Sequence, residues 1–461
     1  MPVADLLRSL LVLSVAALPR PLLLALIQMA KDRASLLSRS RLLSWMIRNT
    51  FYKHFCIGSN MSEIISNTAA IRKRSVDGVI LTYAKEAAVR QTSTQAVTLT
   101  RTDQDLNNWV QSNLQTIEML FPGDYVALRV TGAGPASVDF LKRYTSACTW
   151  ESGSPASTNE METNLKQEHQ ILQDAMRQIC TKAQSRRVRI LVDAEGSRYQ
   201  RAIDEISLNL MAEFNQHSNS SRNENGRATI LNTYQLYLKN NIDKIKRHLQ
   251  HSVDHNYTLG LKLVRGAYMS VEPDREIIHD SKQNTDEAYD AAVKFLLDDR
   301  ANGLEEGSTH AEKWTTDIML ATHNTRSVQE ALKQYMSITK FKDRVQGLAF
   351  AQLMGMADEL SLSLAAHLGQ ITTETTLDYG QDSILTTHAH QNLTFARVRD
   401  PKAPVSNYPE LSVYKYTVWG TLSDCLLYML RRAEENSDAV TRSRGTLMAV
   451  LKELLKRPML L

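Results

Sequence analysis

Eight short β-rich segments recur along the 461-residue chain, and stretches of helical periodicity separate them. Strands that alternate with helices favour a parallel sheet, and eight strand–helix units favour closure into a (βα)8, TIM-like barrel of the α/β class. A doubly wound sheet is the alternative, although the Gly-rich first turn of its dinucleotide-binding form is absent. The expected strands are Gly78–Ala84, Tyr125–Thr131, Val188–Glu195, Ala228–Gln235, Leu259–Gly266, Asp317–Asn324, Val345–Gln352 and Leu411–Trp419. The expected helices include Leu106–Met119, Asn164–Ala183, Ala202–Phe214 and Thr285–Leu297.

The N-terminus differs in charge from the rest of the chain. Residues 1–53 hold eight Lys or Arg and two Asp, a net charge of +6, whereas the remainder has 46 basic and 48 acidic residues. The folded body therefore has no excess of positive charge, which argues against a nucleic-acid partner. Residues 6–53 are rich in Leu, Arg and Ser and hold one acidic residue, Asp32, a composition typical of a mitochondrial targeting segment.

The apolar part of this N-terminal segment is too interrupted to span a membrane. Pro19-Arg20-Pro21 divides the run from Leu10 to Ala30, and neither half reaches the roughly 20 residues that a spanning helix needs. A removable targeting segment and a helical hairpin on a membrane surface both remain open. We therefore expect a targeting or membrane-proximal segment over residues 1–53 and a barrel domain over residues 54–461.

Three polar stretches interrupt the barrel sequence, and we expect each to be a surface loop. They are Glu151–Gln170, Gln216–Arg227 and Ala301–Glu312, all rich in Ser, Asn, Gly or Glu. The four cysteines, none in C-x-x-C spacing, indicate a reduced chain without a disulfide framework. No histidine pair has the spacing of metal ligands, so we expect no metal site. The residues concerned are Cys56, Cys148, Cys180 and Cys425, and His323, His367, His388 and His390.

Polar side chains gather at the carboxyl ends of the expected strands, where (βα)8 barrels carry their chemistry. Any one of them has an ordinary explanation, such as a helix N-cap or a closed turn. Because seven of the eight strands end in polar side chains, we instead predict a cavity lined by hydrogen-bond donors and cationic side chains. Such a cavity suits an anionic or electron-rich ligand. Because the chain has no nucleophile elbow and no metal motif, we expect a cofactor to perform the difficult step. The residues are Arg129, Asp193, Glu195, Gln235, Lys262, Arg265, Thr322, His323, Asn324, Gln352 and Tyr416.

The stretch Tyr428–Asn436 carries a second cluster of donors. In a helix, Tyr428, Arg431, Arg432 and Glu435 fall at i, i+3, i+4 and i+7, on one face. Two guanidinium groups match a small carboxylate, since each donates paired hydrogen bonds in a plane. By itself this face also suits a solvated helix surface, because exposed Arg–Glu pairs are common and weak. An apolar stripe predicted to dock the helix comprises Leu422, Leu426, Met429 and Ala433.

The motifs together resemble those of the mitochondrial proline dehydrogenase (proline oxidase) family, in a fungal-like style. The match runs in order from about Phe55 to Glu435, and the combination is specific although no single motif is. The motifs are LVDAE (Leu191–Glu195), NTYQ (Asn232–Gln235), KLVRGAY (Lys262–Tyr268), ATHN (Ala321–Asn324), QL-x-GM-x-D (Gln352–Asp358), and Tyr428 with RR-x-x-EN (Arg431–Asn436).

The resemblance implies a distorted (βα)8 barrel that holds FAD and oxidises L-proline to Δ1-pyrroline-5-carboxylate. A hydride would pass from proline C5 to flavin N5, in the first step of proline catabolism to glutamate. Electrons would pass on to a quinone, with the protein in the mitochondrial matrix or peripherally associated with the inner membrane. Neither a metal nor a nucleic acid is implied.

The resemblance also assigns roles to residues. Arg431 and Arg432 would bind the proline carboxylate, and Glu435 would hold the arginine pair. Tyr416, Tyr428 and Leu353 would shape the substrate pocket, to which Arg129 would also contribute. The residues implied in catalysis are Asp193, Lys262 and Tyr416. Those implied in flavin binding are Gln235, Lys262, Arg265, Gly266, Ala267, Thr322, His323, Asn324 and Gln352.

Two departures from the family pattern leave more than one substrate compatible with the sequence. Arg129 stands where the family has Lys, and Val418 stands where the family has Pro in Y-x-P-x-G. Charge is kept at the first position, but the shape of the donor changes. Hydroxyproline is therefore an alternative substrate. A related flavin barrel, such as a methylenetetrahydrofolate reductase, and a flavin-binding barrel with a regulatory role but no turnover are further alternatives.

Overall fold

The computed structural model of the chain describes most of its length. The described residues are 3–33, 40–84, 99–147, 159–216, 227–302, 316–338, 348–374, 411–438, 450–451 and 454–455.

Nine parallel strands form one sheet in the order β1-β9-β2-β3-β4-β5-β6-β7-β8, and β9 also pairs with β8. Strands β2 to β9 therefore close into an eight-stranded barrel, which confirms the predicted fold class. Their side chains are buried along nearly the whole length of each strand, as expected for parallel strands covered on both faces. The strands are β1 (Cys56–Gly58), β2 (Gly78–Tyr83), β3 (Tyr125–Leu128), β4 (Arg189–Val192), β5 (Ile230–Gln235), β6 (Leu259–Val264), β7 (Thr316–Ala321), β8 (Leu348–Leu353) and β9 (Ser412–Trp419).

All eight expected strands are present, and several are shorter than the β-rich runs that predicted them. The run Val188–Glu195 contributes only Arg189–Val192 to the sheet, so Asp193 and Glu195 lie just beyond its carboxyl end. The register of β4 on β5, with Ile190 opposite Ile230, ends at Val192. The expected start of β8 at residues 345–347 lies outside the described residues.

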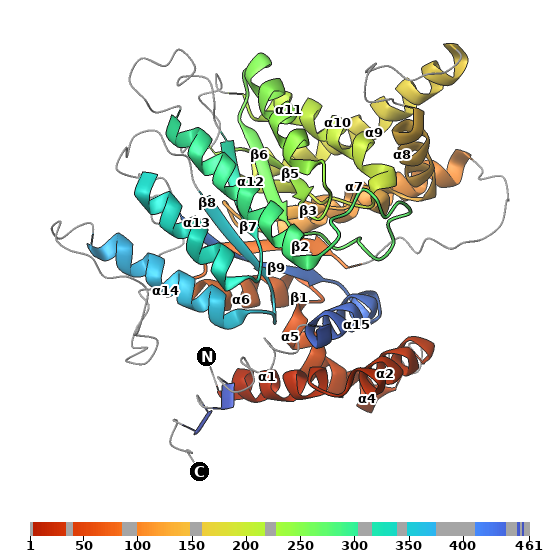
Figure 1. The fold of residues 1–461 in the computed structure, drawn as a ribbon. Coiled ribbons are helices and arrows are strands. Elements are labelled where there is room, and N and C mark those ends of the chain that lie inside the picture. Colours follow the sequence, from red (N-terminus) through yellow and green to blue (C-terminus); the bar gives the residue numbers. More distant parts are fainter. Residues whose placement is uncertain are drawn as a thin grey trace. The chain divides into compact units, whose positions relative to one another are not determined.

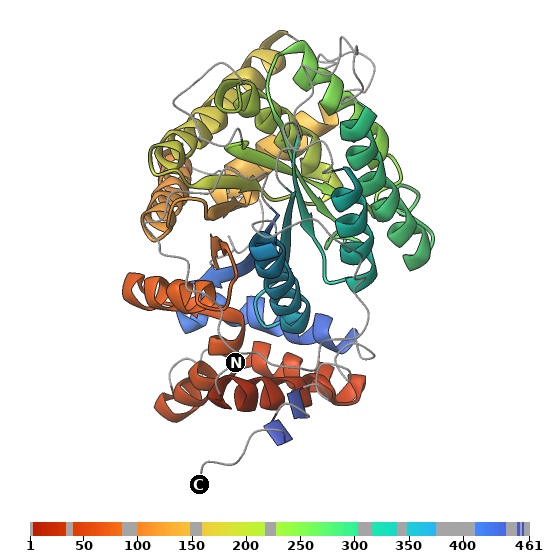
Figure 2. The same cartoon turned by 90° about the vertical axis from the view of Figure 1, so that its left-hand side faces the viewer.

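The chain folds as two compact units. Unit 1 comprises Met1–Glu86, Gln352–Pro401 and Val413–Leu461, and unit 2 comprises Ala87–Ala351 and Lys402–Ser412. Figures 1 and 2 show the elements of each unit. Unit 1 holds the helices α1 (Val3–Ala16), α2 (Arg20–Asp32), α4 (Arg41–Ile47), α5 (Lys53–Phe55), α6 (Met61–Arg72), α14 (Asp358–Glu374) and α15 (Leu422–Asp438), and the π-helix η1 (Arg48–Tyr52). Unit 2 holds α7 (Leu99–Glu118), α8 (Pro135–Ala147), α9 (Asn159–Ser185), α10 (Ser197–Phe214), α11 (Asn241–Asp254), α12 (Lys282–Asn302) and α13 (Thr325–Ile338), and the 3-10 helix η2 (Val130–Ala133).

The N-terminal segment is helical and packs within unit 1. A break at Pro19 separates α1 from α2, and the two helix axes bend by 106°. Both helices bury one face, including Leu13 and Ile27, and both contact α15. Among the described residues no single helix is long and apolar enough to cross a membrane, whereas α1 and α2 together meet the length and composition for a bent span. The predicted boundary at residue 53 stays a prediction.

The three predicted loops have different outcomes. The predicted loop Glu151–Gln170 is wrong over residues 159–170, which form the start of α9, whereas the overlapping predicted helix Asn164–Ala183 is confirmed. Leu165 and Leu172 are buried there, because apolar side chains seven residues apart share one face of the helix despite their polar neighbours. Gln216 forms an isolated bridge with Tyr257, and residues 301–302 end α12. At the end of the second stretch, Arg227 donates to the buried Asp317 over 3.0 Å. The rest of the three stretches, residues 151–158, 217–226 and 303–312, lies outside the described residues, as do Cys148, His388 and His390.

The predictions that the cysteines are reduced and that no metal site is present can be compared with the part of the chain that the structure describes. Cys56, Cys180 and Cys425 are buried free thiols there. No group of three or more His, Cys, Asp or Glu in that part has the arrangement of a metal site.

Candidate functional site

The predicted face on α15 is present in unit 1. Arg432 Nη2 lies 2.5 Å from Glu435 Oε1, and the Arg432 guanidinium lies 5.2 Å from the centre of the Tyr428 ring. Nε of Arg432 is buried and has no hydrogen-bond acceptor among the described residues. Arg431 is partly buried on the same helix. The helix therefore presents a guanidinium group that one carboxylate orients and one aromatic ring supports.

Two features hold α15 in place: its buried apolar stripe and a hydrogen bond to a residue that lies just before the helix. The stripe is buried as predicted, since Leu422, Leu426, Met429 and Ala433 each expose 7% or less of their surface. Ahead of the helix, the Tyr52 hydroxyl donates to the Gly420 carbonyl over 2.6 Å. Such packing limits rotation of the helix, so its polar face keeps one orientation.

Three further predicted residues lie in unit 1. Tyr416 is buried on β9, and its carbonyl accepts a hydrogen bond of 2.8 Å from the Met354 amide. Leu353 packs against the apolar cluster that includes Tyr428 and Met429. Gln352 is buried, and its side-chain oxygen accepts from Ser361 Oγ over 2.9 Å.

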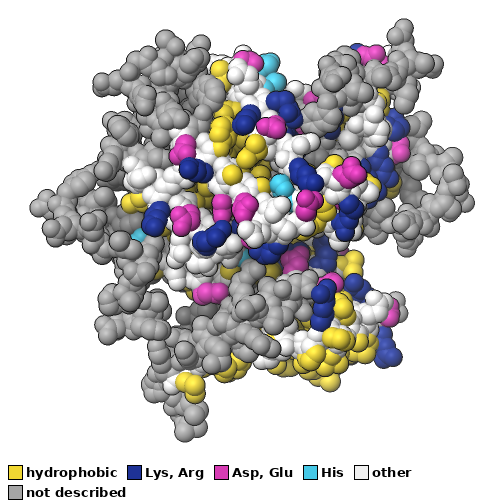
Figure 3. All heavy atoms as spheres, viewed as in Figure 1, with side chains coloured by type: hydrophobic (Ala, Val, Ile, Leu, Met, Phe, Trp, Pro, Cys, Tyr) yellow, Lys and Arg dark blue, Asp and Glu magenta, His cyan; other side chains and the backbone are white. Residues whose placement is uncertain are grey.

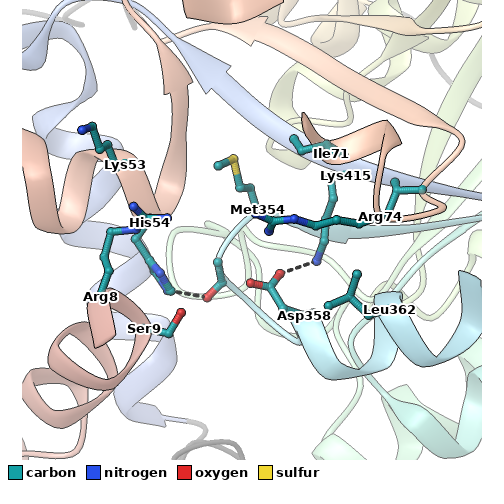
Figure 4. A pocket seen from close by; sticks show the side chains of 12 residues that line it. Arg8, Ser9, Lys53, His54, Ile71, Arg74, Met354, Asp358, Leu362 and Lys415 are labelled. Carbon is teal, nitrogen blue, oxygen red and sulfur yellow. Dashed lines mark hydrogen bonds and ion pairs between the residues drawn. The ribbon is translucent and has the colours of Figure 1, made fainter. Parts of the chain in front are cut away.

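Beside these residues, unit 1 contains a hollow, lined by both charged and apolar side chains, that the sequence did not predict (Figure 4). Lys415 Nζ donates to Asp358 over 2.6 Å at its wall, and the His54 ring lies 3.0 Å from the Gly355 carbonyl. Burial lowers the pKa of His54. Gly355 has φ +76°, and a Cβ there would lie 2.5 Å from the His54 carbonyl oxygen. The motif Gln352–Asp358 therefore serves local packing and an ion pair as well as the candidate site.

In unit 2, a buried ion pair joins Asp193, just beyond the end of β4, to Lys262 within β6. Lys262 Nζ donates to Asp193 Oδ1 over 2.6 Å, and both side chains are buried. The Asp193 amide also donates to the Leu128 carbonyl. A buried charge is costly without its partner, so each member of this pair fixes the other.

Glu195 lies two residues beyond Asp193 and is buried among donors. Thr131 donates to it through both its amide, over 2.9 Å, and its hydroxyl. Burial raises the pKa of Glu195, and the hydrogen bonds from Thr131 and the charge of Arg129 oppose that rise. The Glu195 carbonyl accepts from Gln235 Nε2 over 2.9 Å.

Arg265 follows β6 and is the centre of a polar cluster. Its guanidinium donates to Asp286, to Thr322 Oγ1 over 2.7 Å and to Ser327 Oγ over 3.0 Å, and it stacks on Tyr289 at 4.4 Å. Burial raises the pKa of Asp286, but the hydrogen bonds from Lys282 and Arg265 outweigh that effect, so the pKa is lowered overall. Three of the five guanidinium donors are thus directed to the protein itself.

Gly266 occupies a position that no larger residue fits. Its φ is +126°, and a Cβ there would lie 2.0 Å from Cδ1 of Tyr237. The Tyr237 hydroxyl donates to Glu272 over 2.6 Å, and Glu272 also accepts from the Ser197 amide over 3.1 Å. The glycine of the motif Lys262–Tyr268 therefore lets the turn pass an anchored tyrosine ring.

The remaining predicted residues are partly buried at the same strand ends. The Ala267 amide lies 3.4 Å from Gln235 Oε1, and the Asn324 amide donates to Thr322 Oγ1 over 3.1 Å. Asn324 Oδ1 accepts from the Ser327 amide over 3.3 Å, so this side chain also caps the start of α13. His323 and Arg129 are half-buried.

Several residues that organise unit 2 were missed by the sequence reasoning. Asp286 and Ser327 hold the predicted Arg265 in place, although they lie 21 and 62 positions from it. Glu272 anchors Tyr237, the ring that Gly266 approaches, from 35 positions away. Lys244 donates to Asp204 over 2.9 Å in another buried pair. None carries a local motif, so only the fold identifies them.

Comparison with known proteins gives a consistent result. The family model described as proline dehydrogenase matches residues 64–445. A probable mitochondrial proline dehydrogenase of Schizosaccharomyces pombe is 26% identical over 89% of this chain and 80% of its own length. Mitochondrial proline dehydrogenase 1 of Arabidopsis thaliana is 28% identical over 79% of this chain and 74% of its own length. A hydroxyproline dehydrogenase of Rattus norvegicus is 26% identical over 67% of this chain and 56% of its own length.

Solved structures agree on the fold. Proline utilization A (PutA) from Bdellovibrio bacteriovorus, inactivated by N-propargylglycine, superposes with a TM-score of 0.59 at 14% identity. The match covers 98% of this chain but only 39% of that protein, so the chain spans about two-fifths of its structural relative. The family match covers most of the chain, and the barrel agrees with it: the chain belongs to the proline dehydrogenase family.

Proposed function

We propose that this protein is an FAD-dependent oxidoreductase that converts L-proline to Δ1-pyrroline-5-carboxylate. The single observation that carries the proposal is the face of α15, where Glu435 and Tyr428 hold Arg432 in a chain of this family. A guanidinium group presented in this way suits a carboxylate ligand, since ion pairing and directed hydrogen bonds act on the same two oxygens.

The proposed substrate contacts lie in unit 1. Arg431 and Arg432 bind the proline carboxylate, and Glu435 fixes the position of Arg432. Tyr428, Tyr416 and Leu353 supply aromatic and apolar walls for the ring. Such walls refuse larger amino acids by volume, whereas the arginines refuse amines that lack a carboxylate.

The proposed cofactor contacts belong mainly to unit 2. FAD, when bound, supplies the hydride acceptor. The donors fit such a group in their chemistry, because amides, a lysine and hydroxyls suit the carbonyl and phosphate oxygens of a flavin dinucleotide. The residues that would hold it are Gln235, Lys262, Arg265, Gly266, Ala267, Thr322, His323, Asn324 and Gln352.

Asp193 and Lys262 have a distinct part in the proposal. Their ion pair fixes the ammonium group of Lys262, which lies within β6. A positive charge held there in a buried site favours negative charge that develops nearby during the reaction. Arg129, whose charge also acts on Glu195, completes the positive side of this region.

The location and the electron acceptor are also part of the proposal. Several relatives are named mitochondrial proline dehydrogenases, and the N-terminus of this chain is basic and poor in acidic residues. We therefore place the protein in the mitochondrion, with a quinone of the inner membrane as acceptor. This placement allows peripheral contact with that membrane.

An anaerobic absorption spectrum of the purified protein, before and after addition of L-proline, tests the proposal. Bleaching of a flavin spectrum by L-proline is the expected result. A flavin spectrum that remains oxidised with L-proline but bleaches with 4-hydroxy-L-proline would assign the hydroxyproline alternative, which the Rattus norvegicus relative and the changed residues Arg129 and Val418 favour. Absence of flavin after reconstitution with FAD would overturn the proposal.

A further inference from the structure

We propose that α1, α2 and α4 form a docking surface for an anionic lipid bilayer and remain part of the mature protein. The proposal extends the membrane contact allowed by the proposed function by naming the surface and the lipid charge. It is tested without turnover, so its failure and the failure of the proposed activity are distinguishable.

The first observation is a concentration of exposed apolar side chains. Of the sixteen large hydrophobic side chains that lie exposed in the described residues, nine belong to these three short helices. Among these nine, the most exposed are Leu42, at 67%, and Trp45, at 63%. The nine are Val3, Leu7 and Leu11 on α1, Leu22, Leu24 and Met29 on α2, and Leu42, Trp45 and Met46 on α4.

The exposed side chains follow helical periodicity. Val3, Leu7 and Leu11 are spaced by four residues, so they form a stripe along α1. On α4, Leu42, Trp45 and Met46 have the spacing i, i+3 and i+4. Figure 3 shows hydrophobic side chains gathered over the part of unit 1 that contains α2 and α4. An apolar stripe with Trp and Leu is typical of helices that lie in the interface of a bilayer.

The second observation is that these helices also have a buried face. Leu6, Val12 and Leu13 of α1 and Leu23 and Ile27 of α2 expose 5% or less of their surface. Both helices contact α15, and in Figures 1 and 2 they lie beside α4 at the base of unit 1. Their removal would uncover apolar surface on the helix that carries the arginine pair, which favours retention of residues 3–32.

The third observation is charge. Lys31, Arg33, Arg41 and Lys53 are exposed on or next to these helices. Arg8, Arg74 and Lys415 line the hollow of unit 1, but they are paired with carboxylates, Arg8 and Arg74 with Asp5 and Lys415 with Asp358. Lys53, which also lines the hollow, donates to the uncharged Asn49 side chain over 2.8 Å. Basic side chains beside an apolar stripe attract an anionic leaflet, because each cation near the surface adds to binding.

The positive charge of this surface and the short length of its helices indicate which partner it binds. A second copy of the chain docked on this face would bring two strongly basic segments together, and their repulsion disfavours that interface. Each helix alone is too short to cross a bilayer, and the bend of 106° between α1 and α2 suits a hairpin that lies on the surface. An anionic bilayer satisfies both the apolar stripe and the positive charge.

Flotation of the full-length purified protein with lipid vesicles tests the proposal. We expect the protein to bind vesicles of phosphatidylcholine mixed with phosphatidylglycerol, and to bind pure phosphatidylcholine weakly. The double variant Trp45→Ser/Met46→Ser should lower the partition coefficient by about tenfold or more, since it removes two interfacial anchors. Lys31→Glu/Arg33→Glu should weaken binding to the anionic vesicles selectively.

A matched control removes exposed apolar side chains elsewhere. Ile171→Ser/Met336→Ser changes two side chains of unit 2 that are exposed by 56% and 40%, and it should leave vesicle binding unchanged. Equal loss of binding in both double variants would overturn the assignment of the surface. Failure of the unaltered protein to bind anionic vesicles, a mature protein that lacks residues 3–32, or a dimer in solution that Trp45→Ser/Met46→Ser dissociates would each overturn the proposal.

Discussion

The polar face of α15 and the strand ends of unit 2 are built on opposite principles. On α15, Arg432 is held by one carboxylate and one ring, and its buried Nε has no acceptor among the described residues. In unit 2, Arg265 has three polar partners and an aromatic ring, and Lys262 is paired with Asp193. The first arrangement leaves donors for a ligand, whereas the second uses most of them to fix the barrel.

This difference separates two kinds of positive charge that look alike in a sequence. A charge inside a closed network mainly sets geometry, and its loss leaves a buried partner unpaired. A charge on a supported helix face mainly binds ligand, and its loss spares the fold. Substitutions in unit 2 should therefore change stability strongly, and substitutions on α15 should change substrate affinity.

The largest expected effect comes from the ion pair of unit 2. Lys262→Met should destabilise the protein by about 3–5 kcal/mol, because the buried Asp193 carboxylate loses the ammonium group that neutralises it. Urea denaturation followed by circular dichroism measures the change. The double variant Asp193→Asn/Lys262→Met should recover part of the loss, and a single variant as stable as the unaltered protein would show that the pair does not fix the barrel.

Gly266 offers a second test of the fixed framework. Gly266→Ala should cost about 2–4 kcal/mol, since its Cβ would overlap the Tyr237 ring at a positive φ. Gly196→Ala is the matched control, because its Cβ would have no neighbour nearer than 3.9 Å. Thermal unfolding of both variants should show a much larger drop in Tm for Gly266→Ala; similar drops would contradict the close approach.

The stability of unit 2 should also depend on pH through His248. Burial lowers the pKa of this residue to about 4, and its Nδ1 lies 2.8 Å from the Tyr234 hydroxyl. The unfolded chain binds the proton more readily, so stability is lost as the pH falls below about 6.5, by about 2 kcal/mol between pH 6.5 and pH 5. His248→Gln should reduce this slope in denaturation curves measured at several pH values. An unchanged slope would exclude His248 as its source.

The smallest expected effect concerns the support of the arginine pair. Glu435→Gln should raise the KM for L-proline by about three- to tenfold, because Arg432 loses an ionic partner but keeps a polar neighbour. Steady-state kinetics measures the change, and Tm should stay within about 2 °C since the pair is partly exposed. Glu434→Gln, one position earlier on the same helix, is the control. An equal effect of both variants would argue for a general charge effect rather than a specific contact.

The sequence predicted the features that depend on local periodicity. Eight β-rich runs were enough to predict the barrel. The spacing from Tyr428 to Glu435 was enough to predict which side chains share one face of α15. Strand β1 was missed because three residues, Cys56–Gly58, carry too little pattern. The expected helix Asn164–Ala183 is confirmed within α9, but residues 159–163 were predicted only as part of a loop because they are mostly polar.

The sequence could not show how the polar strand ends are used. Arg265 and Gln235 were expected to contact a ligand, and their closest described partners include Asp286 and the Glu195 carbonyl. These partners lie 21 and 40 positions away, so no motif connects them. Gly355 and Asp358 likewise acquire their roles only from His54 and Lys415.

The central claim is that Arg431 and Arg432 recognise the substrate carboxylate. Its most direct test is a comparison of the unaltered protein with Arg431→Met/Arg432→Met, using anaerobic titration of the flavin spectrum with L-proline and with L-prolinamide, which lacks the charge. The account predicts that the double variant retains its flavin, loses about a hundredfold or more in affinity for L-proline and changes little toward L-prolinamide. Equal losses for both ligands, or an unchanged affinity for L-proline, would contradict it.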